Sequence, residues 1–199
     1  PDPDSFLSFL PLSHAYEHTC GQFVPIGLSA SIYYAEGLEK LAANMEEVKP
    51  TLMVVVPRLF EVLRARIVKT IEKQGGIAVV MFNQAMRLGR KRYENQGLPF
   101  WERPFDALLD KTVRHKVQQR FGGNRKALVS GGAPLNPEVG LFFESLGIKL
   151  LQGYGQTEAA PLISCNRPSR RIKIHTVGPV LDDVEVEIAP GGEIKVRGE

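Results

Sequence analysis

Short apolar runs alternate along this chain with longer segments in which apolar residues recur at the spacing of a helix face. The run Leu52–Val56 is rich in β-branched residues, as expected of a strand that is covered on both faces. Pro57 follows it directly, at the place where the first turn of a helix accepts proline. That helix is expected to end near Lys73 and to bury a stripe of Leu59, Leu63, Ile67 and Ile71. Alternation of this kind predicts an α/β fold.

The same alternation extends over most of the chain. We predict helices over residues 77–93 and 105–121, the second with a buried stripe of Phe105, Leu109, Val113, Val117 and Phe121. A further helix is expected to be capped by Asn136, to have Pro137 as its first residue and to end at Gly147. Strands are predicted over Phe6–Leu10, Lys126–Val129 and Ile148–Gln152.

From about Thr176 the pattern changes to strict alternation of apolar and polar residues. Val184–Ile188 and Glu193–Arg197 are joined by Ala-Pro-Gly-Gly, which predicts a hairpin with one face in contact with solvent. We therefore expect two units. Residues 1–175 would be an α/β unit, and residues 176–199 would be a β-hairpin that opens a β subdomain.

The composition of the chain limits which partners it can bind and in which cellular compartment it is expected. The formal net charge is only +3 and no long basic run is present, which argues against a nucleic-acid-binding protein. Cys20 and Cys165 are too few for a disulfide framework or a zinc cage, which favours a reducing compartment. There is no apolar run of the roughly 20 residues that a bilayer span needs, and no signal peptide. We expect a cytoplasmic protein, and the sequence is compatible with peripheral contact with a membrane.

Two glycine-containing stretches each follow a predicted strand. Ser130–Leu135 (SGGAPL) follows one strand and Gly153–Glu158 (GYGQTE) follows the next. In an open α/β sheet, ligands bind outside the carboxyl ends of strands, so neighbouring strands would place both stretches at one edge. Gly131 and Gly132 would let the backbone lie against a flat ligand.

The residues that accompany these glycines suit a nucleotide. Tyr154 offers a ring that can stack on an aromatic base. Thr157 offers a hydroxyl to a phosphoryl oxygen, and Glu158 offers an oxygen ligand to magnesium. Each also has a structural alternative: the glycines as a simple turn, Tyr154 as a core or rim aromatic, and Glu158 as a carboxylate that favours a helix N-terminus. A nucleotide site is preferred because both stretches occupy equivalent positions after apolar strands.

His14 lies in a third stretch, again at the carboxyl end of a predicted strand. Its imidazole would donate to developing negative charge or shape the mouth of a substrate pocket. The alternative is a histidine held by backbone groups in a strand–helix turn. A metal site formed by His14 and His18 would need a helix that begins before His14, and Pro11 argues against it. Neither the G-x-S-x-G pattern of serine hydrolases nor a phosphate-binding P-loop occurs in the sequence.

Taken in order, these motifs resemble those of the AMP-forming, adenylate-forming enzyme superfamily. GYGQTE at 153–158 is similar to its adenine- and magnesium-binding signature, SGGAPL at 130–135 to its nucleotide-pocket loop, and LPLSHAYEHT at 10–19 to its aromatic/histidine motif. Residues 49–67 resemble the long-chain acyl-CoA synthetase branch, and residues 175–199 resemble the start of that family's β-barrel subdomain. The resemblance implies part of a layered sheet-and-helix N-terminal domain of the adenylate-forming type. Residues 1–175 would be the α/β central part of its nucleotide- and acyl-binding domain.

The resemblance also implies a reaction with two halves. A fatty-acid carboxylate attacks the α-phosphoryl group of ATP, with magnesium present, to give acyl-AMP and pyrophosphate. The thiolate of coenzyme A then displaces AMP. Because a carboxylate is already a nucleophile, catalysis would be mainly positioning and charge neutralisation. The leading hypothesis is thus the core of a long-chain fatty acid–CoA ligase. The alternatives are a fatty acyl-AMP ligase, another acid–CoA ligase of the superfamily, and a non-catalytic nucleotide-binding relic.

Position by position, the resemblance implies catalytic roles for Glu158, Thr157 and His14. Glu158 would hold magnesium, Thr157 would bind the AMP phosphoryl group, and His14 would lie near the reacting carboxyl group. Gly153 would leave room for the acyl chain. The nucleotide-binding residues would be Tyr154, which stacks on adenine, with Gly131, Gly132, Ala133, Gly155 and Gln156.

Several parts of the family's pattern are absent from the sequence: the phosphate loop with its lysine, the ribose-binding aspartate, the hinge, and the C-terminal domain with its catalytic lysine. We therefore expect this chain to be a central fragment that does not form thioesters by itself. Release of AMP by the purified 199-residue chain, dependent on ATP and coenzyme A, would contradict this expectation.

Overall fold

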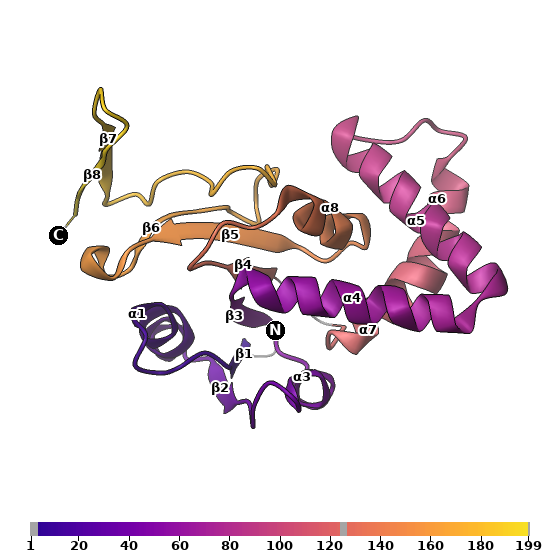
Figure 1. Cartoon of the computed structure of the whole chain (residues 1–199), viewed down its shortest axis with the longest axis horizontal. Coiled ribbons are helices and arrows are strands. Elements are labelled where there is room, and N and C mark those ends of the chain that lie inside the picture. Colours follow the sequence, from indigo (N-terminus) through magenta and orange to yellow (C-terminus); the bar gives the residue numbers. More distant parts are fainter. Residues whose placement is uncertain (1–3, 124–126, 199) are drawn as a thin grey trace.

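The computed structural model describes residues 4–123 and 127–198 and confirms an α/β fold (Figure 1). Its main sheet has the order β2-β1-β3-β4-β5-β6, in which β6 is antiparallel to β5 and all the other neighbouring strands are parallel. The strands are β1 (Ser5–Ser8), β2 (Ser31–Tyr34), β3 (Leu52–Val55), β4 (Ala127–Ser130), β5 (Leu150–Gly155) and β6 (Leu162–Cys165).

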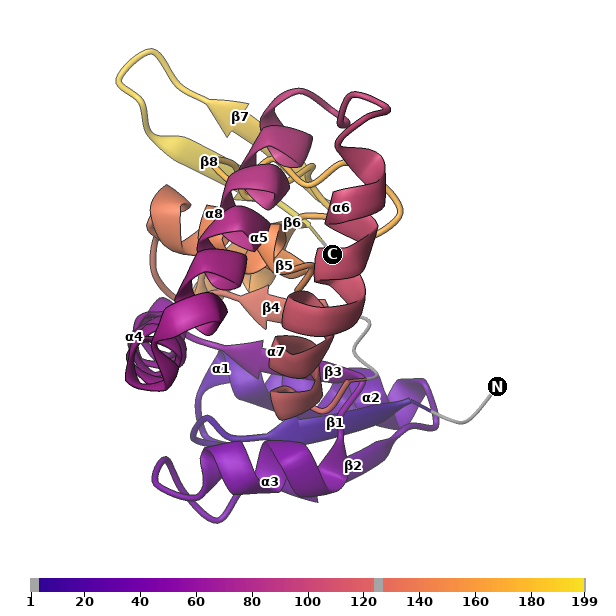
Figure 2. The same cartoon turned by 90° about the vertical axis from the view of Figure 1, so that its right-hand side faces the viewer.

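Helices connect and cover these strands, and the long helix α5 lies alongside α6 (Figure 2). None of the helices within the described residues is long and apolar enough to cross a membrane. In chain order they are α1 (Ala15–Glu17), the π-helix η1 (His18–Phe23), α2 (Val24–Gly27), α3 (Leu41–Val48), α4 (Pro57–Gln74), α5 (Gly76–Glu94), α6 (Arg103–Leu109), the π-helix η2 (Asp110–Arg114), α7 (His115–Arg120), α8 (Pro137–Ser145) and the 3-10 helix η3 (Thr157–Ala159).

The main core forms where α3, α4, α7 and α8 pack on the sheet. Helix α4 begins at Pro57, as predicted, and its apolar stripe joins this core, with Ile71 only partly buried at its far end. In β3, Met53, Val54 and Val55 are all buried, which confirms a strand covered on both faces. Helical spacing and β-branched composition were sufficient to place these two elements.

The prediction of one continuous α-helix over residues 105–121 is wrong, because the segment is not α-helical throughout. The segment is divided into α6, the π-turns of η2 and α7. A π-turn contains more residues than an α-turn, so the faces before and after it no longer align. As a result Phe105 is 39% exposed instead of buried, while Leu109, Val117 and Phe121 do enter the core.

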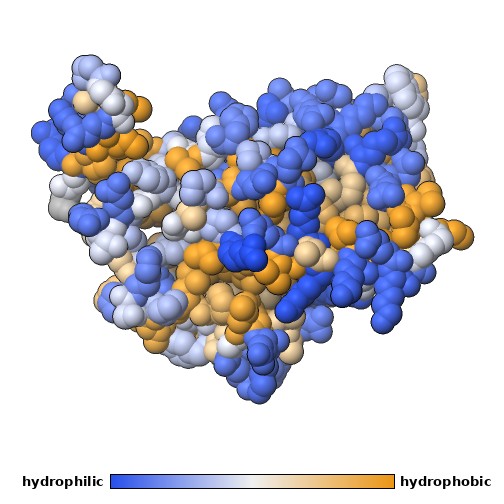
Figure 3. All heavy atoms as spheres, viewed as in Figure 1, coloured by the Kyte–Doolittle hydropathy of each residue, from blue (hydrophilic) through white to orange (hydrophobic). Residues whose placement is uncertain are grey.

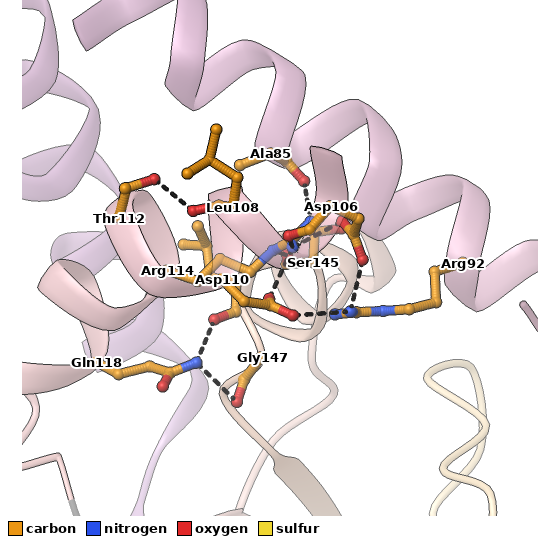
Figure 4. Close-up of polar contacts among 11 residues, drawn as sticks. Ala85, Arg92, Asp106, Leu108, Asp110, Thr112, Arg114, Gln118, Ser145 and Gly147 are labelled. Carbon is orange, nitrogen blue, oxygen red and sulfur yellow. Dashed lines mark hydrogen bonds and ion pairs between the residues drawn. The ribbon is translucent and has the colours of Figure 1, made fainter. Parts of the chain in front are cut away.

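The same π-turns direct Arg114 into the protein, where its side chain is fully buried (Figure 4). Its Nε donates to the carbonyl oxygen of Ser145 at 2.8 Å and its Nη2 to that of Ala85 at 2.8 Å. Its Nη1 forms ion pairs of 2.7 Å with Asp106 and Asp110. One guanidinium group therefore fixes α5, α6, η2 and α8 together.

Helix α8 and strand β5 lead into the second glycine-containing stretch. Asn136 caps α8 as predicted, because its Oδ1 accepts from the backbone N–H of Glu138 at 2.9 Å. The helix ends at Ser145, and Gly147 adopts a φ of 73° in the turn that follows. Strand β5 starts later than predicted and continues through Gly155. The predicted strand at Lys126–Val129 is observed from Ala127 onward, and Lys126 lies outside the described residues.

The predicted C-terminal hairpin is present as β7 (Glu185–Ile188) and β8 (Ile194–Arg197), a separate two-stranded sheet. The expectation that one of its faces would be covered is wrong for the described residues, because every residue in both strands is exposed. Its side chains still alternate in character, with Val186 opposite Val196 and Ile188 opposite Ile194.

Candidate functional site

The two glycine-containing stretches lie at the same edge of the sheet. Strands β4 and β5 are parallel neighbours, and Ser130, at the end of β4, pairs with Gln152. Residues that follow Ser130 and residues that follow Gln152 therefore leave the sheet in the same direction. The turn between β5 and β6 and helix α1 are on this side of the molecule, at the left of Figure 1. This confirms that neighbouring strands place both stretches at one edge.

Gly153, Tyr154 and Gly155 belong to the end of β5 and not to a free turn. They pair with β6, and the register shifts between Tyr154 and Gly155. A β-carbon on Gly153 would touch mainly the Leu162 side chain, at 3.1 Å, whereas one on Gly155 would overlap the carbonyl oxygen of Pro161. Glycine at 155 is thus required by the close approach of two backbones.

The contact at Gly155 gives a prediction about stability. Gly155→Ala should lower the free energy of unfolding by about 1–3 kcal/mol, because the added methyl group forces β5 and β6 apart. Urea unfolding followed by circular dichroism would measure the change. Gly191→Ala, in the exposed β7–β8 turn, is the matched control because a β-carbon there meets nothing within 4 Å. Equal stability of the two variants would contradict the backbone contact.

Tyr154, Thr157 and Glu158 are presented outward from this ribbon. The Tyr154 ring is half-buried, and its hydroxyl oxygen accepts from Nε2 of Gln156 at 2.9 Å. Thr157 and Glu158 are exposed in η3. The Glu158 carboxylate makes no ion pair with any residue from 4–123 or 127–198. A ring, a hydroxyl and a free carboxylate are therefore available along one short segment.

The Ser130–Leu135 stretch divides into a packed and an open part. A β-carbon on Gly131 would lie 2.9 Å from Cζ of the Tyr16 ring, so this glycine allows the aromatic ring to approach the backbone. Gly132 has a φ of 79° and, like Ala133, is exposed. The Tyr16 hydroxyl donates to the carbonyl oxygen of Val129 at 3.0 Å, and burial raises the pKa of this phenol.

Sequence reasoning did not single out Tyr16, although it lies within the stretch that contains His14. The only signal was an aromatic residue two positions after the histidine. Its bond to Val129 ties the segment after β1 to the end of β4 across the intervening strand β3. Tyr16 thereby brings the third stretch to the edge where the other two lie.

His14 is exposed and serves as the N-cap of α1. Its Nδ1 accepts from the backbone N–H of Tyr16 at 3.2 Å, and its own backbone N–H bonds to the carbonyl oxygen of Pro11. Helix α1 begins after His14, and His18 is the first residue of the π-helix η1. The two histidines therefore do not have the i, i+4 spacing on one α-helix that a metal site would need. Because Nδ1 accepts the capping bond, Nε2 is the ring nitrogen left for another hydrogen bond.

A buried carboxyl group lies directly behind this capped turn. Glu17 is 0% exposed, and its Oε1 accepts from the Ser8 hydroxyl at 2.6 Å. Gln22 donates to the same hydroxyl oxygen at 3.1 Å, and Tyr34 donates to Gln22 at 2.8 Å. Burial raises the pKa of Glu17, and the bond from Ser8 opposes this only in part.

The raised pKa predicts a pH dependence with a definite sign. A carboxyl group whose pKa is higher in the folded than in the unfolded protein favours folding when protonated, and this contribution is lost as pH rises from the unfolded pKa through the folded one. Glu17→Gln cannot ionise, so its melting temperature should rise relative to that of the parent protein between pH 4 and pH 8. The exposed Glu47→Gln is the control, and a difference for Glu17→Gln that does not change with pH would refute the prediction.

The site can be compared with known proteins. A family model described as AMP-binding enzyme matches residues 1–199. Long chain acyl-CoA synthetase 6, peroxisomal, from Arabidopsis thaliana is 29% identical over 213 residues, which cover 98% of this chain and 29% of that protein. Long-chain-fatty-acid–CoA ligase FadD15 from Mycobacterium bovis is 28% identical over 201 residues, 98% of this chain and 32% of that protein.

Solved structures show the same fold. O-succinylbenzoate coenzyme A synthetase from Bacillus subtilis, in complex with ATP and magnesium ion, aligns with a TM-score of 0.61 and 15% identity over 100% of this chain and 33% of its own. The chain spans about a third of the length of the curated relatives it matches. All three stretches at the sheet edge fall within the matched residues.

Proposed function

Since the chain belongs to the AMP-binding enzyme family, we propose that the full-length protein containing it is a long-chain fatty acid–CoA ligase that works through an acyl-AMP intermediate. Support for the long-chain branch comes from the acyl-CoA synthetase and fatty-acid–CoA ligase relatives. The substrates would be a long-chain fatty acid, ATP and coenzyme A.

One observation carries the proposal. The pairing of Ser130 with Gln152 makes the open glycine turn at Gly132 and the outward groups of residues 154–158 share one edge of the sheet. That edge offers a ring, a hydroxyl and an unpaired carboxylate within five consecutive residues, which is the set of contacts that a base, a phosphate and its counter-ion require. A relic without chemistry would have no physical need for the last two.

In the first half-reaction, an oxygen of the fatty-acid carboxylate bonds to the α-phosphorus of ATP while the bond from that phosphorus to the pyrophosphate oxygen breaks. Tyr154 stacks on adenine, with its phenol oriented by Gln156. The exposed Thr157 hydroxyl donates to the α-phosphoryl group. His14, at the same edge of the sheet, would lie near the reacting carboxyl group of the fatty acid. No general base is needed, so these residues act by positioning and by charge neutralisation.

Magnesium fits this arrangement through Glu158. No group of three or more His, Cys, Asp or Glu residues gathers as a metal site in the described parts of the chain. Magnesium often takes only one or two carboxylates from a protein and completes its shell with phosphate oxygens and water. The exposed Glu158 carboxylate meets that requirement, and the ion would supply neutralisation of the phosphate charge.

In the second half-reaction, the thiolate of coenzyme A bonds to the acyl carbonyl carbon, and AMP departs as the carbon–oxygen bond to its phosphate breaks. Gly153 would leave room for the acyl chain, since a β-carbon there would lie 3.1 Å from Cδ1 of Leu162 and 3.4 Å from the carbonyl oxygen of Ser164. Residues 1–175 would form the α/β part and residues 176–199 would open a β subdomain. The separate β7–β8 sheet supports the second unit, although Pro179 and Leu181 still bond to β6.

The test uses the full-length protein and exchange of labelled pyrophosphate into ATP. Exchange should depend on a fatty acid and should be strongest with long chains, and added coenzyme A should yield acyl-CoA and AMP. Exchange without thioester formation would identify a fatty acyl-AMP ligase, and preference for a short or aromatic acid would identify another acid–CoA ligase. Absence of both exchange and nucleotide binding would identify a non-catalytic protein.

A further inference from the structure

A cavity of about 320 Å³ lies within the helical part of the molecule, between α4, α5, η2 and α7. This volume is at the lower end of the range of small-molecule sites, about 300–1,000 Å³. Flexible aliphatic side chains form most of its wall. They are Ile67 and Ile71 of α4, Ile77, Ala78 and Met81 of α5, and Val113 and Val117 of η2 and α7.

The charged side chains that line this cavity are all positive. Lys116 and Arg120, one helical turn apart on α7, contribute to the lining together with the uncharged Gln74 and Thr112. None of the lining residues is acidic. Neither cation forms an ion pair with another residue in the described ranges. Arg120 also lines a neighbouring hollow, and Glu46 lines that hollow too. The positive charge of the first cavity is therefore argued mainly from Lys116.

The cavity is well separated from the nucleotide edge. Helix α4 starts at that edge, directly after β3, and its last turns line the cavity. At 1.5 Å per residue, its 18 residues span about 27 Å. Figure 1 shows α5, α6 and α7 at the opposite end of the molecule from α1 and the β5–β6 turn. Hydrophobic side chains also reach the surface at the right of Figure 3. Ile77, in the first turn of α5, is 81% exposed.

We propose that this cavity binds a second molecule of a single-chain anionic amphiphile, of the class of a long-chain fatty carboxylate, with its alkyl chain between α4 and α5 and its head group at Lys116 and Arg120. The volume accommodates one alkyl chain and not the paired chains of a phospholipid. An aliphatic wall suits a flexible chain, and the unpaired cations complement a negative head group.

Binding would be tested on the full-length protein with the nucleotide edge saturated by a non-hydrolysable acyl-AMP mimic. The probe is the fluorescent fatty acid 11-(dansylamino)undecanoate, displaced by saturated carboxylates of increasing length. Affinity should rise about fourfold per added methylene until the cavity is full. The uncharged alcohol of the same chain length should bind about tenfold more weakly, as should the carboxylate to Lys116→Glu, because each removes or reverses partly exposed charge contacts.

Two matched controls locate the site. Lys111→Glu reverses an exposed cation of η2 that does not line the cavity, and Val80→Phe enlarges an exposed residue of α5 outside the lining. Both should bind the probe normally, whereas Ala78→Phe should block the alkyl chain. If Ala78→Phe fails to fold, the comparison of alcohol with carboxylate and of Lys116→Glu with Lys111→Glu still decides the question.

Three results would overturn the proposal: no probe binding once the nucleotide edge is blocked, equal loss in Lys116→Glu and Lys111→Glu, or binding only to vesicles of anionic phospholipid. The last would assign the cations to a lipid surface. Pyrophosphate exchange, measured in parallel, should be unchanged in Lys116→Glu. Failure of exchange in the parent protein would count against the proposed reaction and not against this cavity.

Discussion

Glu158→Ala is expected to slow formation of acyl-AMP by about 100- to 1,000-fold, the loss typical when one charge-stabilising group is removed from a transition state. The carboxylate is exposed and has no ion-pair partner in the described part of the chain, so its removal leaves no buried group unsatisfied. The rate should therefore fall without a comparable loss of stability. Fatty-acid-dependent pyrophosphate exchange and thermal unfolding of the full-length variant measure the two effects separately.

The alternative role of Glu158 is that of a carboxylate at the start of a helix. Glu138, in the first turn of α8, is the matched control because it is an exposed acid in that context. Glu138→Ala should cost about 0.3–1 kcal/mol of stability, from the helix dipole and from its exposed ion pair with Arg90, and should leave exchange unchanged. If Glu158→Ala behaved in the same way, Glu158 would have no part in the chemistry.

Arg114→Met is expected to lower the free energy of unfolding by about 3–5 kcal/mol, the cost of removing one partner from a buried charge network. The side chain is fully buried, and its loss leaves Asp110 and the carbonyl oxygens of Ala85 and Ser145 without their donor (Figure 4). Urea unfolding would measure the loss. Arg114→Lys should restore little, because an ammonium group cannot donate in three fixed directions as the guanidinium does.

Arg87→Met provides the control for this prediction. Arg87 is on the exposed side of α5 and donates to Gln84, so its replacement should change stability by no more than about 0.5 kcal/mol. A similarly small effect at Arg114 would mean that α5, α6 and α8 are held by apolar packing alone. The small cluster of Ala85, Leu88, Leu98 and Leu109 is the packing that would then have to suffice.

Sequence reasoning placed the elements whose signal is local. The stripe of α4 and the apolar run of β3 identify buried faces by composition and spacing, and the cap at Asn136 depends on a single side chain. The edge strand β2 gave no such signal, because none of its four residues is buried. Strand β6 was missed for another reason: it is recognisable only by its pairing with β5, which sequence spacing does not encode.

The candidate site was predictable in its location and less so in its local geometry. Two glycines around Tyr154 read as a turn, since glycine is frequent in turns. In the structure they are strand residues, and Gly155 is required by the backbone of Pro161, a contact that depends on the fold of the next strand. Arg114 was missed because a charged residue outside the apolar stripe of a helix is normally directed to solvent, and the π-turn that reverses this leaves no mark on the spacing.

Because β5 extends three residues beyond the last paired residue of β4, Tyr154 lies on an arm in which β5 pairs only with β6, and β6 in turn bonds to Pro179 and Leu181. A tilt of this arm would carry the phenol and the Glu158 carboxylate together, with their mutual spacing preserved, while their height above Gly132 changed. Under the proposed function, the adenine and the triphosphate of one ATP would then be bound or released together. Stiffness of the arm, set where Gly155 meets Pro161, would govern how tightly the two sides of the nucleotide can be held at once.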